Sequence, residues 1–181
     1  MRLFAAIPVP PAIHPALARA AEPLHNCMGV RPLPPGSWHI TLLFIGDADE
    51  EKAKQISDAL AQIRFSQFSV RLFGAGAYPN VHFPRAIFVG GESSGAVALA
   101  AEIERALLPF GFQKEKFSVH VTVARSRGAG DIEDFLKKTG DVGQFEARSF
   151  ALMQSRLLPH GASYEIVREF PAQENVRQFF P

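Results

Sequence analysis

The tetrapeptide HITL at residues 39–42 has a near copy later in the chain, HVTV at residues 120–123. Each places a His, an aliphatic residue, a Thr and a second aliphatic residue in that order. The chain has 181 residues but only six His and three Thr, so random placement would rarely produce even one His followed two positions later by a Thr. The two motifs therefore call for one common explanation.

Both motifs lie in segments with strand character. SWHITLLFIG (37–46) and KFSVHVTVAR (116–125) are rich in β-branched and aromatic residues. Side chains alternate between the two faces of a strand, so His39 and Thr41 share one face while Ile40 lies on the other. The second motif alternates in the same way. Each segment is thus predicted to anchor itself in an apolar layer and to present an imidazole beside a hydroxyl.

The rest of the chain alternates between helical and strand-like segments. Apolar residues at helical spacing predict helices at 12–27, 47–63, 94–109 and 131–140. Further strands are predicted at 2–7, 67–73 and 86–91, with two more between 145 and 170. The Gly- and Pro-rich segment 74–85 is expected to be a loop. Each His–Thr strand is followed by a helix and another strand, and this order predicts an α+β fold with antiparallel sheets.

Composition excludes several classes of protein. With 47% hydrophobic and 20% charged residues the chain should fold, and a net charge of +1 excludes a strongly basic coat for nucleic acid. The single cysteine, Cys27, permits no internal disulfide and no Cys-based zinc site. The opening MRLFAAIPVPP is too short, and too broken by Pro, for a signal peptide or membrane span. A soluble, cytoplasmic protein is expected.

Two His–Thr strands that face each other across a cleft would offer two imidazoles and two hydroxyls. One imidazole can act as a base while the other acts as an acid, which suits cleavage of a phosphodiester. A Thr hydroxyl can donate to a phosphate oxygen as charge builds there, and no metal is required. A single such pair is more simply explained as part of the core, but two pairs favour catalysis. The residues alone do not say which His is the acid.

Paired His-x-Thr/Ser-x motifs define the two-histidine (2H) phosphoesterase superfamily. Within it, the chain resembles the RNA 2′,3′-cyclic phosphodiesterases, first named 2′–5′ RNA ligases, from the opening RLFAAIPVP to LMQSRLLPHGASYEIVREFP near the end. The resemblance implies that residues 1–181 form a single bilobal domain. Its two lobes of antiparallel sheet, with helices outside, would be related by a pseudo-twofold axis, and the motifs would line the central cleft.

The resemblance also implies a mechanism. His39 would be the proton donor and His120 the proton acceptor in hydrolysis of the cyclic phosphate to a 2′-phosphate, while Thr41 and Thr122 hold the phosphate oxygens. Run backwards, the reaction would form a 2′–5′ linkage without ATP. No cofactor and no metal are implied. The expected partner is RNA with 2′,3′-cyclic phosphate ends, tRNA fragments among them, bound by a monomer.

Two residues that follow the His–Thr motifs are further site candidates. The family carries an Arg after the second motif, matched here by Arg125 and expected near the phosphate. Strict alternation, however, puts Arg125 on the strand face opposite His120. Phe44 holds the corresponding place after the first motif and is a candidate contact for a nucleobase. Just before His120 the chain has Ser118-Val119, where relatives commonly carry a Pro.

Other hypotheses remain open. The enzyme could act on small cyclic phosphates such as nucleotides. Longer RNA should bind through additional basic residues, and the candidates are Arg31, Arg71, Arg85, Arg125, Arg127 and Arg156. A module that binds RNA ends without turnover is a hypothesis of another class. Binding alone has no evident need for two complete His–Thr pairs, which argues against it. A metal-dependent hydrolase is the weakest hypothesis.

Overall fold

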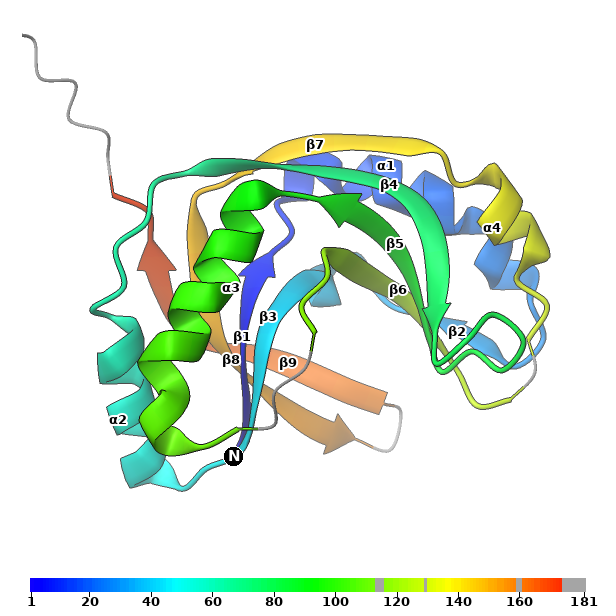
Figure 1. Cartoon of the computed structure of the whole chain (residues 1–181). Coiled ribbons are helices and arrows are strands. Elements are labelled where there is room, and N and C mark those ends of the chain that lie inside the picture. The colour runs from blue at the N-terminus through cyan, green and yellow to red at the C-terminus, as the bar shows by residue number, and fades with distance from the viewer. Residues whose placement is uncertain (113–115, 129, 159–160, 174–181) are drawn as a thin grey trace, which may run out of the picture.

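The computed structural model describes residues 1–112, 116–128, 130–158 and 161–173, which form two antiparallel sheets with helices packed outside them (Figure 1). The first sheet contains β1 (Arg2–Pro8), β3 (His39–Asp47), β8 (Ser149–Leu158) and β9 (Gly161–Pro171), in the order β3-β1-β8-β9. The second contains β2 (Val30–Pro32), β4 (Phe68–Tyr78), β5 (Ala86–Glu92), β6 (His120–Ser126) and β7 (Asp141–Ala147), in the order β2-β6-β5-β4-β7. Every pairing between these strands is antiparallel, which confirms the α+β prediction.

The α-helices of the described residues are α1 (His14–Ala21), α2 (Glu50–Leu60), α3 (Ser94–Leu107) and α4 (Glu133–Lys138). Each lies inside a segment predicted to be helical. The acidic start of α2 has a clear role, because the Asp49 side chain accepts a hydrogen bond of 2.8 Å from the backbone N–H of Lys52 and caps the helix. None of the helices in the described residues is long and apolar enough to span a membrane.

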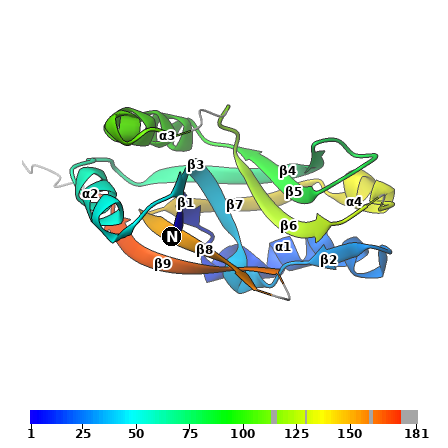
Figure 2. The same ribbon diagram turned by 90° about the horizontal axis from the view of Figure 1, so that it is seen from below.

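The two halves of the chain have a similar order of elements, and each contributes to both sheets. β1 is followed by α1, the short β2, β3 and α2, and β5 is followed by α3, β6 and α4. α1 packs on β6 and β7 of the second sheet, while α3 packs on β3 of the first and β4 of the second. β4 of the first half pairs with β5 and β7, and β8 of the second half pairs with β1. Figure 2, seen from below, shows α2 and α3 at one end of the molecule and α4 and β2 at the other.

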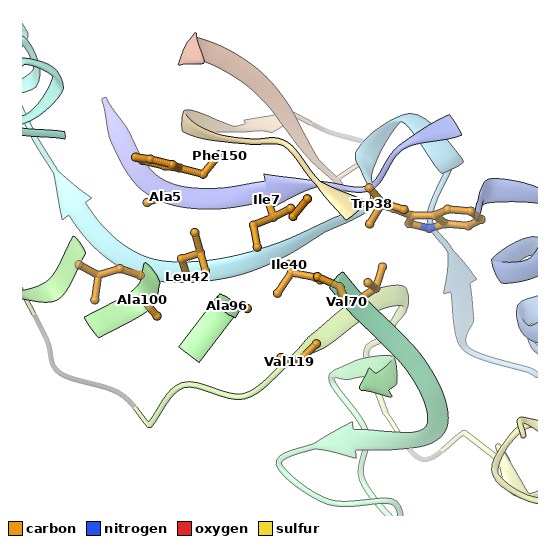
Figure 3. Close-up of a cluster of buried hydrophobic side chains, with 14 of the residues drawn as sticks. Ala5, Ile7, Trp38, Ile40, Leu42, Val70, Ala96, Ala100, Val119 and Phe150 are labelled. Carbon is orange, nitrogen blue, oxygen red and sulfur yellow. The ribbon is translucent and has the colours of Figure 1, made fainter. Parts of the chain in front are cut away.

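The main core lies behind the His–Thr strands. The aliphatic residues of both motifs are almost fully buried, as predicted: Ile40, Leu42, Val121 and Val123. Figure 3 shows Ile40 and Leu42 extending from β3 toward Ala96 and Ala100 on α3. The small side chains of Ala96 and Ala100 let α3 lie close to β3, and both are buried. Burial of one face of β3 therefore leaves the other face for polar groups.

The segment 74–85 is not entirely a loop, because β4 continues to Tyr78. Its small residues face a large ring on the neighbouring strand. A Cβ built on Gly76 would lie 2.5 Å from the Cζ of Phe88, so only Gly leaves room for that ring. Gly76, part of the Gly- and Pro-rich pattern that predicts a loop, thus serves close packing inside a sheet.

β8 and β9 confirm the two strands predicted between residues 145 and 170, but the start of that region needs correction. Three strands cover this region, because β7 ends at Ala147 and β8 begins at Ser149. β7 pairs with β4 of the second sheet, whereas β8 pairs with β1 of the first. Sequence periodicity does not reveal that two consecutive strands belong to different sheets.

We predict that Ile40→Ala lowers the free energy of unfolding by about 3 kcal/mol, because it leaves a cavity between β3 and α3. Ile166 on β9 is 52% exposed, so it offers a matched control. Ile166→Ala should cost about 0.5 kcal/mol or less. Urea denaturation followed by the fluorescence of the single Trp measures both values. Equal losses in the two variants would contradict the central place of Ile40 in the core.

Candidate active site

β3 and β6 lie next to each other where the two sheets meet (Figure 1). A cleft with a volume of about 490 Å³ opens there, and its lining includes His39, Thr41, His120 and Thr122. All four side chains are partly exposed, whereas the aliphatic residues that alternate with them are buried. The structure therefore brings both motifs to the same cleft.

A bulge in β3 decides which later residue reaches the cleft. The register between β1 and β3 shifts between Ala5 and Ala6, and Leu42 and Leu43 are both buried. Two successive residues on one face reverse the alternation of the strand. Phe44 therefore returns to the face of the imidazole, where it lines the cleft and is 51% exposed.

β6 contains a similar bulge. Its register with β5 shifts between Ile87 and Phe88, and Val123 and Ala124 are both buried. Arg125 therefore returns to the cleft and lines it. Strict alternation predicted that Arg125 would face away from His120, but the bulge turns it to the same face. Its position now agrees with the family resemblance, which placed it near the phosphate.

His39 is held by one hydrogen bond and two aromatic rings. Its Nδ1 lies 2.8 Å from the backbone oxygen of Ser37, which can only accept, so Nδ1 carries the hydrogen and Nε2 remains the acceptor. The ring centroids of Phe4 and Tyr164 lie 5.0 and 4.8 Å from that of the imidazole. Burial lowers the pKa of His39 to about 4; the Ser37 hydrogen bond opposes this, and nearby positive charge lowers the pKa further.

His120 has more polar surroundings. Its Nδ1 lies 3.0 Å from the backbone oxygen of Ser118 and 3.2 Å from the hydroxyl of the same residue. The Ser118 hydroxyl in turn lies 3.0 Å from the Tyr78 hydroxyl. The rings of Tyr78 and Phe88 lie 5.4 and 5.2 Å from the imidazole. Burial is the main reason that the pKa of His120 is also lowered; the Ser118 carbonyl opposes it, and the charge of Arg125 adds to it.

The two imidazoles thus offer the same chemistry in one cleft. In each, a backbone carbonyl occupies Nδ1 and leaves Nε2 unprotonated in the neutral ring. One Nε2 can accept a proton, and the other can deliver one once it is protonated. The neighbouring hydroxyls of Thr41 and Thr122 can donate to an anionic oxygen held between the imidazoles.

The cleft is positively charged. Arg2, Lys116 and Arg125 line it, and the described lining residues include no Asp or Glu. Within the described part of the chain, none of these three cations forms an ion pair. Unpaired positive charge in a concave site attracts anionic substrates. The described residues contain no group of three or more His, Cys, Asp or Glu side chains that could hold a metal ion.

Comparison with known proteins agrees with this geometry. The model of the LigT-like phosphoesterase family matches residues 7–88 and 91–164. The chain belongs to this family. An Archaeoglobus fulgidus protein named RNA 2′,3′-cyclic phosphodiesterase is 35% identical over 94% of this chain and 99% of its own length. An Aeropyrum pernix protein with the same name is 36% identical over 89% of this chain and 97% of its own length.

Solved structures of similar proteins have the same fold. The crystal structure of TT0787 from Thermus thermophilus superposes with a TM-score of 0.81 at 28% identity, covering 94% of this chain and 97% of that chain. The crystal structure of Escherichia coli LigT complexed with 3′-AMP superposes with a TM-score of 0.80, over 96% and 98% of the two chains. At 23% identity the second comparison supports the fold alone.

The sequence pattern did not reveal every residue of this phosphoesterase cleft. The aromatic neighbours of the imidazoles and two of the cations went unnoticed: Phe4, Tyr78, Phe88, Tyr164, Arg2 and Lys116. Most come from strands distant from the motifs in sequence and carry no motif of their own. Of the six candidate arginines, Arg125 lines the cleft, whereas Arg71 and Arg156 form ion pairs with Asp141 and Glu165 on the surface.

We predict that burial of His39 makes the protein less stable at acidic pH. Because its pKa is about 4 in the folded protein and near 6.5 in the unfolded chain, the unfolded chain binds more protons between these values. Stability should therefore fall as the pH falls through this window, and His39→Gln should reduce the loss. Urea denaturation at pH 7 and pH 4.5 measures it. His25→Gln, on the exposed surface, should keep the wild-type loss; an equal loss in His39→Gln would contradict the prediction.

Proposed function

We propose that this protein hydrolyses RNA 2′,3′-cyclic phosphate ends to 2′-phosphomonoesters. The observation that carries the proposal is the meeting of two His–Thr pairs in one positively charged cleft, each imidazole with an unprotonated Nε2. Membership of the LigT-like phosphoesterase family supports the chemistry. Several relatives that cover most of the chain are named RNA 2′,3′-cyclic phosphodiesterase, which supports the substrate.

In the proposed reaction, Nε2 of His120 takes a proton from water as the water oxygen attacks phosphorus. The bond from phosphorus to the 3′ oxygen breaks, and protonated His39 delivers its proton to that oxygen. The phosphate stays on the 2′ oxygen. Thr41 and Thr122 donate to the non-bridging oxygens as their charge increases. Proton exchange with solvent then restores both imidazoles.

The surroundings of the two imidazoles place different demands on these roles. A pKa of about 4 leaves His39 almost wholly neutral at pH 7, so as a proton donor it depends on the bound phosphate to raise that pKa. His120 has two oxygens near Nδ1, so a positive charge on its ring is better stabilised and the ring suits a proton acceptor. The bound cyclic phosphate is an anion, so it raises the pKa of both imidazoles and helps His39 to become protonated.

Arg125 and Phe44 complete the proposed site. Arg125 would balance charge on the phosphate, and Phe44 would stack on a nucleobase. Their positions support these roles, because both line the cleft and the Phe44 ring lies 6.2 Å from the ring of Phe4, beside His39.

The charge of the cleft favours RNA over small cyclic phosphates. Beyond Arg125, Arg2 and Lys116 add two cations to its lining, more than one cyclic phosphate needs. We infer that they contact phosphates farther along an RNA strand. A 5′-hydroxyl that enters in place of water would reverse the reaction and form a 2′–5′ linkage. A module that only binds RNA ends is the remaining alternative, and turnover distinguishes it.

We also infer that residues 1–181 form one domain that works as a cytoplasmic monomer on ends such as those of tRNA fragments. Exchange of strands between the halves supports a single domain, since neither sheet is built from one half alone. The free Cys27 supports a reducing compartment. One chain supplies every group of the proposed site, which supports a monomer.

The proposed function predicts turnover of a short RNA ending in a 2′,3′-cyclic phosphate, in the presence of EDTA, with a 2′-phosphate as the product. His39→Ala and His120→Ala should each lower kcat by roughly 10²-fold or more, because each removes a proton-transfer group. His25→Ala, on the exposed surface, should keep wild-type activity. Product ends are identified by mass spectrometry and phosphatase sensitivity. No turnover by folded wild type, or activity that survives loss of either cleft imidazole, would refute the mechanism.

The inferred contacts with longer RNA predict a dependence on length and salt. A dinucleotide or longer RNA should have a higher kcat/KM than a mononucleoside 2′,3′-cyclic phosphate, and the advantage should shrink as salt rises. Arg2→Gln and Lys116→Gln should each reduce kcat/KM for the RNA by roughly threefold to tenfold and change the mononucleotide little. Arg105→Gln, which removes a cation of α3 outside the cleft, is the matched control. Equal effects on both substrates would favour small cyclic phosphates.

A further inference from the structure

A serine stands two residues before the His in both motifs, but the two side chains behave differently. The backbone oxygens of Ser37 and Ser118 both accept a hydrogen bond from Nδ1 of the following His. The Ser37 hydroxyl turns away and donates to the backbone oxygen of Pro34 at 2.8 Å. The Ser118 hydroxyl instead lies 3.2 Å from Nδ1 of His120. The motifs are alike in sequence and unlike in their hydroxyls.

Tyr78 extends this difference. Its hydroxyl lies 3.0 Å from that of Ser118, and both residues line the cleft. Tyr78 is on β4, which is separated from β6 by β5, so its side chain reaches across the middle strand. The Tyr78 ring stacks on Phe88 of β5 at 4.7 Å between centroids. The hydroxyl is thus held by residues of a regular sheet.

The hydrogen atoms in this cluster can be assigned from chemistry. The backbone oxygen of Ser118 only accepts, so Nδ1 of His120 must carry a hydrogen, and the Ser118 hydroxyl oxygen is then a second acceptor for it. Tyr78 can donate its own hydrogen to that hydroxyl oxygen. Both bonds to Nδ1 strengthen when the ring becomes positive, because charge-assisted hydrogen bonds are the stronger ones. Two aromatic rings lie near each imidazole, but among the described residues Nδ1 of His39 has one oxygen partner where Nδ1 of His120 has two.

We propose that the paired hydroxyls of Ser118 and Tyr78 are a positioning element that holds the orientation of His120 and stabilises its ring when it has accepted a proton. Neither residue touches the reacting atoms in this proposal, since both act through the imidazole. The proposal rests on the proposed function for the identity of the reaction. The stabilisation of a charged His120 ring holds without any substrate.

Other charged or titratable groups line the cleft with this imidazole, and their influence on its pKa is the same in every variant. They are His39 from β3, Arg125 from β6, Lys116 from the segment before β6, Arg2 from β1 and Tyr164 from β9. A variant that removes only the Ser118 hydroxyl leaves all of them in place. A change in His120 can therefore be assigned to that hydroxyl.

The test compares Ser118→Ala and Tyr78→Phe with wild type. NMR titration of the imidazole carbon-bound hydrogens reports the pKa of each His in the protein without substrate. We expect Ser118→Ala to lower the pKa of His120 and to leave that of His39 unchanged, with a smaller change in the same direction for Tyr78→Phe. Ser37→Ala is the matched comparison, because its hydroxyl bonds to Pro34, so His120 should titrate as in wild type.

Kinetics on an RNA with a 2′,3′-cyclic phosphate end give the second measurement. Ser118→Ala should lower kcat by roughly tenfold, with KM changed by less than about twofold, because the lost interaction strengthens mainly as His120 becomes charged. Ser118→Thr, which keeps a hydroxyl, should recover most of the loss. Thermal unfolding checks that each variant is folded.

Unchanged titration of His120 in folded Ser118→Ala would overturn the proposal, even if activity fell. A Ser118→Thr variant that titrates like Ser118→Ala would also overturn it. If wild type failed to turn over the RNA, the proposed function would fail, but the titration would still decide whether the hydroxyls stabilise the charged imidazole. The two failures are therefore distinguishable.

Discussion

Burial of the aliphatic residues in β3 and β6 is the constraint on which the cleft depends. Each strand keeps one apolar face against the core, where Ile40 and Val121 are fully buried. Because a strand has only two faces, the His and Thr side chains must then share the other face. The two strands lie side by side where the sheets meet, so these polar faces form a single site. The forces that stabilise the fold therefore also position the chemistry.

The bulges extend this principle. Each inserts one extra buried residue after the His–Thr pair, which adds apolar contact in the core and turns the next side chain toward the cleft. In β3 that side chain is Phe44, an aromatic surface, and in β6 it is Arg125, a positive charge. The two strands thus share a bulge at the same place but present different side chains to the cleft. Under the proposed function, Phe44 would contact the base of an RNA end and Arg125 its phosphate.

The same four-residue pattern also carries two imidazoles with different affinities for a proton. The rings of Phe4 and Tyr164 pack against the ring of His39 and against each other, and burial lowers the pKa of His39 to about 4. The ring of His120 lies beside the Ser118 hydroxyl, which can share a positive charge. In the proposed reaction one imidazole takes a proton while the other gives one, and different surroundings allow the pKa of each ring to be set separately.

The local features could be predicted from the sequence alone. They are the helices and most strands, the shared face of each His–Thr pair, and the burial of the aliphatic residues in both motifs. These follow from periods of two or 3.6 residues, which depend on neighbouring positions only. Tertiary structure alone decided that β4 continues through its Gly/Ala run to Tyr78, that β7 and β8 join different sheets, that Arg125 faces the cleft, and that Tyr78 approaches His120. Bulges, strand partners and side-chain neighbours arise where segments distant in sequence pack together, so no local pattern records them.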